Sequence, residues 1–266
     1  MVRSSREYDG TNWAAGNPLN TATGTTGQII GILSAALITG GDRVPASPRS
    51  IANVSEYDGT NWTAVTALPA VRQDQGTAGT QTAGLVFSGM ADTHPGTGNT
   101  IYNTTLEYNG ASWTSGGNVP VSIRSQGGSG TQTDAFSMGG NPNTTPTSVT
   151  SVFNYDGTSW TANPASLGVA RQRMAYSSST PSATAFVAKG GAPGGSNTCE
   201  IYNRSATVIT PATWASGGAM TLGRYNAFGY GTQDAAVASS NDGTYVTTTE
   251  EYDGASWTGG GALNTG

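Results

Sequence analysis

Residues 7–13 read Glu-Tyr-Asp-Gly-Thr-Asn-Trp, and five further copies of this segment, one identical and four altered, follow along the chain. The copies occupy residues 56–62, 107–113, 154–160, 251–257 and, in a stretched form, 202–214. Counted from Tyr to Tyr, successive copies are 49, 51, 47, 47 and 50 residues apart. A period of this length is typical of repeated β-sheet units, whereas helical repeats are mostly shorter.

Each copy predicts a β-hairpin. An Asp-Gly or Asn-Gly pair, such as Asp58-Gly59, would occupy the two positive-φ positions of a type I′ turn. Tyr and Trp are good strand residues, so the Tyr would end one strand and the Trp would open the next. The stretched copy lacks the pair, and a longer loop is expected there. We expect equivalent places for Tyr8, Tyr57, Tyr108, Tyr155, Tyr202 and Tyr252, and for Trp13, Trp62, Trp113, Trp160, Trp214 and Trp257.

The composition is poor in charge and rich in small residues. Of 266 residues only 10% are charged, against about 25% in an average globular chain, and 39 are glycine. The six Trp and six of the eleven Tyr are placed in phase with the repeat, which favours a packed core over disorder, and we expect a single domain over residues 1–266. The net charge of −5 with no basic run argues against nucleic acid as a partner.

Neither a membrane span nor a disulfide is expected. The longest apolar run, Ile29 to Ile38, is too short to cross a bilayer, which takes about 20 residues. The first hairpin follows Met1 too closely to leave room for a cleaved signal peptide. Cys199 is the single cysteine, so an internal disulfide and a cysteine-rich metal cluster are excluded, and we expect it in a buried strand.

A second recurring motif lies between the hairpins. Turns of the Gly-Thr-Gln kind, the first of them at Gly24-Thr-Thr-Gly-Gln28, precede short apolar segments that end in glycine. No segment keeps a 3.6-residue apolar period, so each repeat predicts a four-stranded antiparallel meander. An arginine follows the Trp by ten or eleven residues in four repeats, at Arg72, Arg124, Arg171 and Arg224. We interpret these arginines and the glutamates that precede the repeated Tyr as partly buried ion pairs that link strands.

An apolar strand, a glycine doublet such as Gly139-Gly140, and a Tyr and a Trp a few residues apart resemble the kelch repeat. The resemblance covers nearly the whole chain and implies an all-β, kelch-like β-propeller, with four-stranded antiparallel blades around a central channel. The repeats predict five full blades from about Thr21 through Trp257, and residues 3–15 supply two strands of a partial sixth blade. Because open sheet edges attract other strands, we expect the partial blade to be covered.

The residue pattern of the repeats, with Tyr155-Asp-Gly-Thr-Ser-Trp-Thr and Gly130-Thr-Gln-Thr, also resembles repeats of virion structural proteins of tailed bacteriophages. This resemblance implies a non-enzymatic structural component of a phage virion, in a tail, nozzle, fibre or capsid decoration. The expected location is the extracellular particle. The expected partners are other virion proteins or copies of the chain itself, without membrane insertion.

Enzyme classes known on such propellers find few candidate residues here. Copper-dependent carbohydrate oxidases of the kelch type use two histidines, and this chain has only His94. Glycosidases need two carboxylates at a defined separation, but the unrepeated acids Asp42, Asp74, Asp92 and Asp242 are scattered through presumed loops. A serine nucleophile would lack a phased histidine partner. We therefore expect no catalytic residue, no cofactor and no metal site.

The alternative left open is a recognition module that binds a host receptor or glycan through its loops. Unrepeated, exposed aromatic side chains would favour it. The candidates are Tyr102, Tyr176, Tyr225, Tyr230 and Tyr245.

Overall fold

The structure is a computed structural model that describes most of the chain. The described residues are 4–23, 27–43, 49–92, 99–144, 147–176, 184–188, 198–203, 213–221, 228–232, 235–239 and 247–263. Within these ranges every regular element is a β-strand, and every named strand pair is antiparallel. The predicted all-β class is therefore confirmed for the described residues.

The described strands form five four-stranded sheets, which we number in chain order. Sheet 1 contains β3 (Gln28–Ile32), β4 (Ala35–Thr39), β5 (Val54–Tyr57) and β6 (Trp62–Val65). Sheet 2 contains β7 (Gly76–Gly79), β8 (Gly84–Phe87), β11 (Thr105–Tyr108) and β12 (Trp113–Gly116). Sheet 3 contains β13 (Gly127–Thr131), β14 (Asp134–Met138), β15 (Val152–Tyr155) and β16 (Trp160–Ala162). Sheet 4 contains β17 (Ala175–Tyr176), β18 (Thr184–Ala188), β19 (Cys199–Asn203) and β20 (Thr213–Ser216), and sheet 5 contains β21 (Phe228–Thr232), β22 (Ala235–Ser239), β23 (Thr249–Tyr252) and β24 (Trp257–Gly259).

Two further sheets have two strands each. The first, which we call the short sheet, consists of β1 (Ser5–Tyr8) and β2 (Trp13–Gly16). The second pairs β9 (Met90–Ala91) with β10 (Thr100–Ile101), in the connection between the second and third strands of sheet 2, and the repeat does not predict it.

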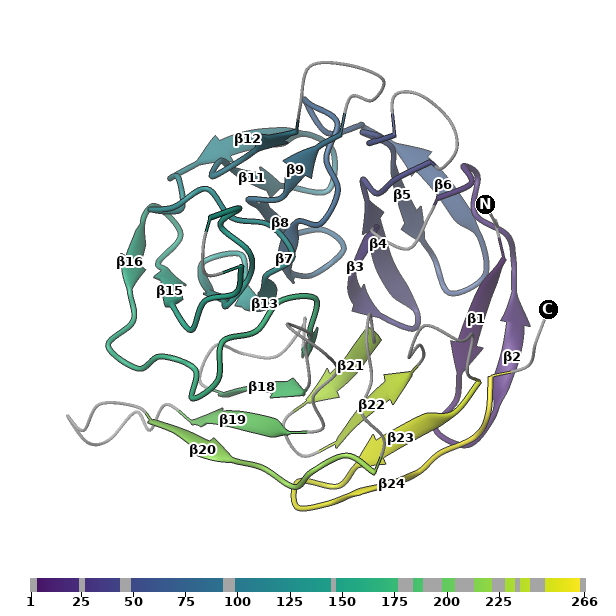
Figure 1. Cartoon of the computed structure of the whole chain (residues 1–266). Coiled ribbons are helices and arrows are strands. Elements are labelled where there is room, and N and C mark those ends of the chain that lie inside the picture. Colours follow the sequence, from purple (N-terminus) through teal and green to yellow (C-terminus); the bar gives the residue numbers. More distant parts are fainter. Residues whose placement is uncertain are drawn as a thin grey trace.

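The sheets are arranged as a propeller-like ring (Figure 1). The first strands β3, β7, β13 and β21 lie nearest the centre, while the fourth strands β6, β12, β16, β20 and β24 form the rim (Figure 1). The short sheet lies between sheet 5 and sheet 1, and the two chain ends lie beside it (Figure 1). The predicted arrangement of four-stranded antiparallel sheets in a ring is thus observed.

The hydrophobic core is divided among the interfaces between neighbouring sheets. Ile30 and Leu37 of sheet 1, for example, pack with Val86 and Tyr108 of sheet 2 in one buried cluster. The same faces meet between sheets 2 and 3, between sheets 3 and 4, and between sheets 4 and 5. Each sheet therefore buries both faces only when it has a complete neighbour on either side.

Side chains bridge the centre of the ring. The Tyr176 hydroxyl on β17 donates a hydrogen bond of 2.7 Å to Gln28 Oε1 on β3, which joins sheet 4 to sheet 1. A Cβ atom added at Gly128 would collide with the Thr77 backbone, and one added at Gly229 with Ala175 and the Tyr176 backbone. Glycine is needed there because the first strands of adjacent sheets approach so closely. The channel implied by the kelch resemblance is thus crossed by a hydrogen bond.

The hairpin turns differ from the predicted type I′. Tyr57 pairs directly with Trp62, which leaves four residues between the strands. Gly59 has a positive φ of 90°, but Asp58 does not. The Asp58 carboxylate instead accepts hydrogen bonds from the Thr60 and Asn61 amides, at 2.8 and 2.7 Å. Because the turn has four residues, its backbone amides need a local acceptor, and the Asp58 carboxylate provides it. A two-residue turn does not require such an acceptor.

Candidate interaction site

The repeated Tyr and Trp occupy equivalent places. In all six hairpins the Tyr lies directly opposite the Trp, including Tyr202 opposite Trp214 in the stretched copy. In the other five hairpins the ring centroids lie 4.8 to 5.0 Å apart, with planes tilted by 31 to 35°. The repeated Tyr and Trp thus share one register in all six hairpins, and in these five the two rings pack against each other.

Four of the six repeated tyrosine hydroxyls bond directly to a glutamate of the preceding sheet. Tyr108 donates to Glu56 Oε1 at 2.9 Å, and Tyr155 donates to Glu107 Oε1 at 2.5 Å. The other two bonds of this kind join Tyr57 to Glu7 and Tyr8 to Glu251. These last two attach the short sheet to both of its neighbours, so the ring closes at its rim through side chains.

These bonds correct the predicted role of the repeated glutamates, which was an ion pair with the repeated arginines. Each motif glutamate accepts a hydrogen bond from a tyrosine of the next sheet instead. The hydrogen bond to Glu7 raises the pKa of Tyr57 to about 12, and the bond to Glu251 does the same for Tyr8. At Tyr108 burial and then the bond to Glu56 raise the pKa to about 12.

Two interfaces lack the glutamate and replace it differently. Asn154 stands in its place in sheet 3, and Asn163 bridges the interface. Asn163 Nδ2 donates to Asn154 Oδ1 at 2.8 Å and to the Tyr202 hydroxyl at 3.1 Å. In sheet 4 the position holds Ile201, and the Tyr252 hydroxyl donates to its own turn at Gly254 O, at 3.0 Å. The Tyr202 hydroxyl is thus still bonded to the preceding sheet, through Asn163, whereas the Tyr252 hydroxyl bonds within its own hairpin.

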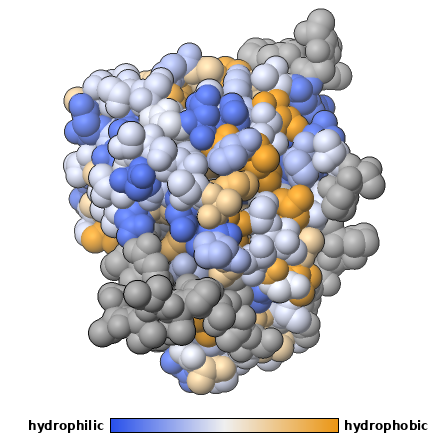
Figure 2. All heavy atoms as spheres, turned by 90° about the vertical axis from the view of Figure 1, so that its left-hand side faces the viewer, coloured by the Kyte–Doolittle hydropathy of each residue, from blue (hydrophilic) through white to orange (hydrophobic). Residues whose placement is uncertain are grey.

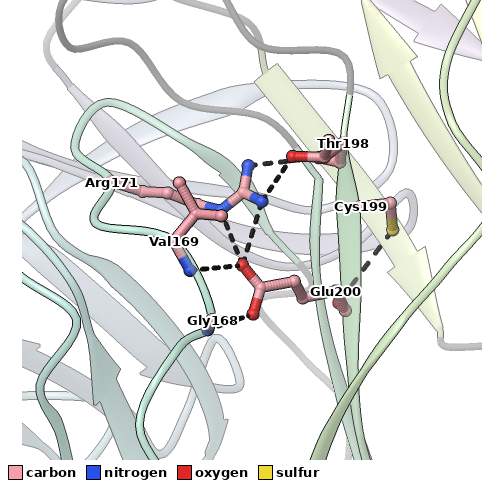
Figure 3. Close-up of polar contacts among 6 residues, drawn as sticks. All are labelled: Gly168, Val169, Arg171, Thr198, Cys199 and Glu200. Atoms are coloured by element: carbon pink, nitrogen blue, oxygen red, sulfur yellow. Dashed lines mark hydrogen bonds and ion pairs between the residues drawn. The ribbon is translucent and has the colours of Figure 1, made fainter.

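Arg171 is the centre of a buried network (Figure 3). Its guanidinium, 1% exposed, contacts Glu200 Oε1 through Nη2 at 2.9 Å and Nε at 3.0 Å. It also donates to the Thr198 carbonyl at 3.1 Å and the Thr198 hydroxyl at 2.7 Å. The amides of Gly168 and Val169 point at the same Glu200 carboxylate, at 2.5 and 3.3 Å (Figure 3). Every strong donor and acceptor here is engaged within the sheet, which indicates a structural role.

Arg72 holds the same place in sheet 2 with different partners. Its guanidinium lies 4.6 Å from the centre of the Tyr102 ring and donates to the Ser88 carbonyl at 2.8 Å. It also donates to the Thr104 carbonyl and hydroxyl, at 3.1 and 2.7 Å. The position of Glu200 is taken by Leu106, and burial lowers the pKa of Arg72 to about 10. Tyr102, one of the candidate recognition residues, thus covers a buried cation.

The predicted common phase of the arginines is wrong for Arg124. Backbone bonds show the equivalence: Gly41 N donates to Arg72 O, Gly89 N to Ile123 O, and Gly140 N to Arg171 O. Arg124 therefore lies one residue later, with Nη1 3.8 Å from Asp74 Oδ2. The loop between the Trp and the next sheet varies by one residue, so counting from the Trp does not preserve register. Arg224 lies outside the described residues.

The described residues hold no group of three or more His, Cys, Asp or Glu side chains arranged to bind a metal ion. His94 and Asp242 lie outside them, and Asp92 pairs with Arg49 at 3.5 Å. Cys199 is buried, as predicted, and burial raises the pKa of its thiol to about 11, which disfavours the reactive thiolate. The described chain contains no helix long and apolar enough to span a membrane.

The remaining candidate recognition tyrosines differ in how much of the residue is exposed to solvent. Tyr176 is buried at the centre of the ring, where burial raises its pKa to about 12. Tyr230, on the first strand of sheet 5, is 37% exposed, although the protein around its hydroxyl raises its pKa to about 12 as well. Tyr225 and Tyr245 lie outside the described residues. Of the candidates that the structure describes, Tyr230 alone presents a large part of its side chain to solvent.

A turn glutamine links consecutive sheets at the end opposite the buried arginines. Gln81 Nε2 donates to the Ala36 and Tyr57 carbonyls of sheet 1, at 3.1 and 2.7 Å. Gln132 Nε2 makes the same two bonds to sheet 2, with Gly84 and Tyr108 at 3.0 and 2.7 Å. Each glutamine thus needs a carbonyl of the second strand and one of the third strand in the preceding sheet.

Sheet 1 has apolar residues at this turn. Ile32 and Leu33 stand where sheet 2 has Thr80 and Gln81, and they are 62% and 51% exposed. Sequence reasoning missed them because it placed the first turn of this kind at Gly24-Thr-Thr-Gly-Gln. The preceding sheet here is the short sheet, which among the described strands has no second strand to accept the bond. We call β1, β2, Ile29, Ile32, Leu33, Ile38 and Tyr230 the short-sheet sector.

The side of the ring that carries β16 has a different character. Figure 2 shows hydrophilic residues there interleaved with broken apolar patches. Because apolar atoms make up more than half of an ordinary protein surface, these patches do not by themselves mark a site. The short-sheet sector is distinguished by combining exposed apolar residues with a strand edge.

No protein-family model and no curated protein matches the chain. Among solved structures, the fold is similar to one titled "Structure of YjhT", with a TM-score of 0.69 and 14% sequence identity. The match covers 93% of this chain and 87% of that one. At this identity the likeness establishes a shared propeller fold.

Proposed function

We propose that the chain is a non-enzymatic structural component of a phage virion, in a tail, nozzle, fibre or capsid decoration. It would work in a protein assembly with other virion proteins or copies of itself, in the extracellular particle. In this proposal the sheets form five full kelch-like blades and the short sheet is a partial sixth. The assignment to a phage virion rests on the resemblance of the repeat sequences to repeats of phage structural proteins.

The observation that carries the assembly role is the short-sheet sector. A two-stranded sheet stands between sheets 5 and 1, and beside it Ile32 and Leu33 are more than half exposed. Strand edges and exposed apolar groups are features that proteins usually cover, because both promote association. A rigid ring with one such sector is suited to bind a neighbour in a fixed orientation.

The use of the charged side chains supports a non-catalytic role. Glu56 and Glu107 accept tyrosine hydrogen bonds, and Arg171 is paired with Glu200. The carboxylates of Asp9, Asp58, Asp156 and Asp253 each cap their own turn. A catalytic group must be free to act on a substrate, whereas these groups are bound within the fold.

The alternative is a recognition module for a host receptor or glycan. Tyr230 favours it, because an exposed aromatic ring is a common platform for sugars and peptides and this one is 37% exposed. Its position at the short-sheet sector makes coverage by a protein neighbour the preferred explanation.

The test is to locate the chain. Antibodies against the purified protein should label one fixed part of tailed particles, and peptides of the chain should appear in the mass spectrum of purified particles. Finding the chain only in the soluble fraction, away from particles, would contradict the structural role. A glycan array with the wild type and Tyr230→Ala would test the alternative, since recognition through Tyr230 predicts a signal that the variant loses.

A further inference from the structure

We propose that the short sheet is an acceptor site for a β-hairpin of a partner polypeptide, which would pair with β1 and complete a four-stranded sheet. This inference deepens the proposed assembly role and rests on it. It names the place of contact and the secondary structure of the partner.

The first argument is the free edge of β1. In the five larger sheets the equivalent third strand has a neighbour on both sides, whereas among the described residues β1 pairs with β2 alone. Asp9 N donates to Asn12 O at 3.2 Å, and antiparallel bonds alternate from there. The backbone N–H and C=O groups of Arg6 and Tyr8 therefore point away from β2, toward the centre of the ring.

The second argument is incomplete burial on both flanking sheets. Ile29 and Ile38 of sheet 1 are half-buried, although Thr77 and Val86, at the same positions of sheet 2, are fully buried. On sheet 5, Tyr230 is 37% exposed. Its equivalents Ile30, Ala78 and Ser129 are each 0% exposed. The same positions are therefore covered wherever the neighbouring sheet has its first two strands.

The third argument is the changed turn of sheet 1. A glutamine at Leu33 would find only a third-strand carbonyl on the short sheet, because the second strand is missing from the described chain. The chain has Ile32 and Leu33 there instead. Burial of these apolar side chains by a partner is favourable because it removes apolar surface from water. A glutamine at this turn would have no second-strand carbonyl of the described chain to bond to.

The complete sheets define the occupant. It must supply two antiparallel strands of four to five residues, joined by a short turn, as β7–β8 and β13–β14 do. It should carry small residues where it meets Ile29 and Tyr230. The hairpin β13–β14 already meets this demand, because Gly127 packs against the ring of Tyr176, at the position equivalent to Ile29.

A second copy of the chain is a poorer donor. Each of its inner hairpins that the structure describes is already part of a four-stranded sheet. Donating one would open an equal gap in the donor, so exchange between copies would leave the number of incomplete sheets unchanged. A different polypeptide with a free glycine-rich hairpin has no such cost.

The test is binding of a labelled synthetic peptide with the sequence of residues 126–140 to the full chain. Fluorescence anisotropy should rise to a plateau at one peptide per chain, and a scrambled peptide should not bind. Arg6→Pro removes one of the two N–H groups at the free edge, so binding should weaken at least about tenfold. Arg6→Ala is the matched control and should bind like the wild type.

A fused version makes the result independent of a weak affinity. The same hairpin joined behind Gly266 by a flexible Gly/Ser linker has a high effective concentration at the site. It should raise the Tm by several degrees in the wild type and in Arg6→Ala, but not in Arg6→Pro.

Equal behaviour of Arg6→Pro and Arg6→Ala in both experiments would overturn the acceptor site. So would light scattering that shows a dimer of the wild type which Arg6→Pro dissociates, because a second copy would then be the occupant. Either result could occur while antibodies still locate the chain on particles, so failure of the hairpin site and failure of the virion role are distinguishable.

Discussion

The sector formed by sheets 2 and 3 and the short-sheet sector differ mainly near the centre of the ring. Between sheets 2 and 3 the first strands are buried, Gln132 links the sheets, and Tyr155 bonds to Glu107. The short-sheet sector keeps the corresponding tyrosine bonds on both sides, Tyr8 to Glu251 and Tyr57 to Glu7. Among the described residues it has no inner strands, and Leu33 takes the place of the glutamine. Closure of the rim and filling of the centre are therefore separate properties of this fold.

The largest effect is expected in a complete sheet. Glu200→Ala would leave the buried Arg171 cation without its carboxylate, and breaking a buried pair from one side costs about 3 to 5 kcal/mol. The free energy of unfolding from urea titration measures this loss. The matched change Glu7→Ala in the half-buried short sheet should cost far less, and equal losses would contradict the comparison.

The next effect is the loss of a tyrosine hydroxyl. Tyr108→Phe removes a bond to a carboxylate in a fully buried place, and we expect a loss of about 2 kcal/mol. Tyr8→Phe makes the same change in the short sheet, where the residue is half-buried. It should lower the free energy of unfolding by less than half as much, again measured by urea titration. A larger effect at Tyr8 would mean that rim closure limits the stability of the whole ring.

A smaller effect is expected at the turns. Gly59 has a positive φ of 90°, so Gly59→Ala should lower the free energy of unfolding by about 1 kcal/mol. Gly10 has nearly the same φ, 97°, but belongs to the short sheet. If that sheet opens locally, Gly10→Ala should speed hydrogen exchange of residues 5–16 with little change in global stability. Equal global losses for the two variants would show that the short sheet unfolds together with the rest.

The smallest predicted effect is a pH dependence. The pKa values of Tyr8, Tyr57 and Tyr108 are raised to about 12, above the value of about 10 for an unperturbed tyrosine. Their contribution to stability is fully present below pH 10 and is lost as the pH rises toward 12. Thermal melts over this range should show a falling Tm, with a shallower fall in Tyr108→Phe. Identical slopes in the two proteins would contradict a role for this hydroxyl.

The period and the pairing of Tyr with Trp could be predicted because both are local and repeated six times. The partners of the side chains could not. Arg124 misses the place of Arg72 by one residue, since a loop of variable length separates each arginine from its Trp. Asn163 bridges Asn154 and Tyr202 at an interface where the repeat is broken, so no repeated signal marked it. The apolar turn at Leu33 was hidden by an assignment of the turn to Gly24–Gln28.

The segment that follows sheet 5 lies beside the short sheet, and this arrangement has a mechanical consequence. Gly260 N donates to Thr249 O at 3.0 Å, and the Thr249 hydroxyl donates to Gly261 O at 2.6 Å, so residues 260–261 are held against sheet 5 beside β1 and β2 (Figure 1). Tension applied to both termini would load the Tyr8 to Glu251 contact first, while sheets 2 and 3 lie on the far side of the ring. Under such tension the ring would open at the short sheet, while the contacts among the remaining sheets stay intact.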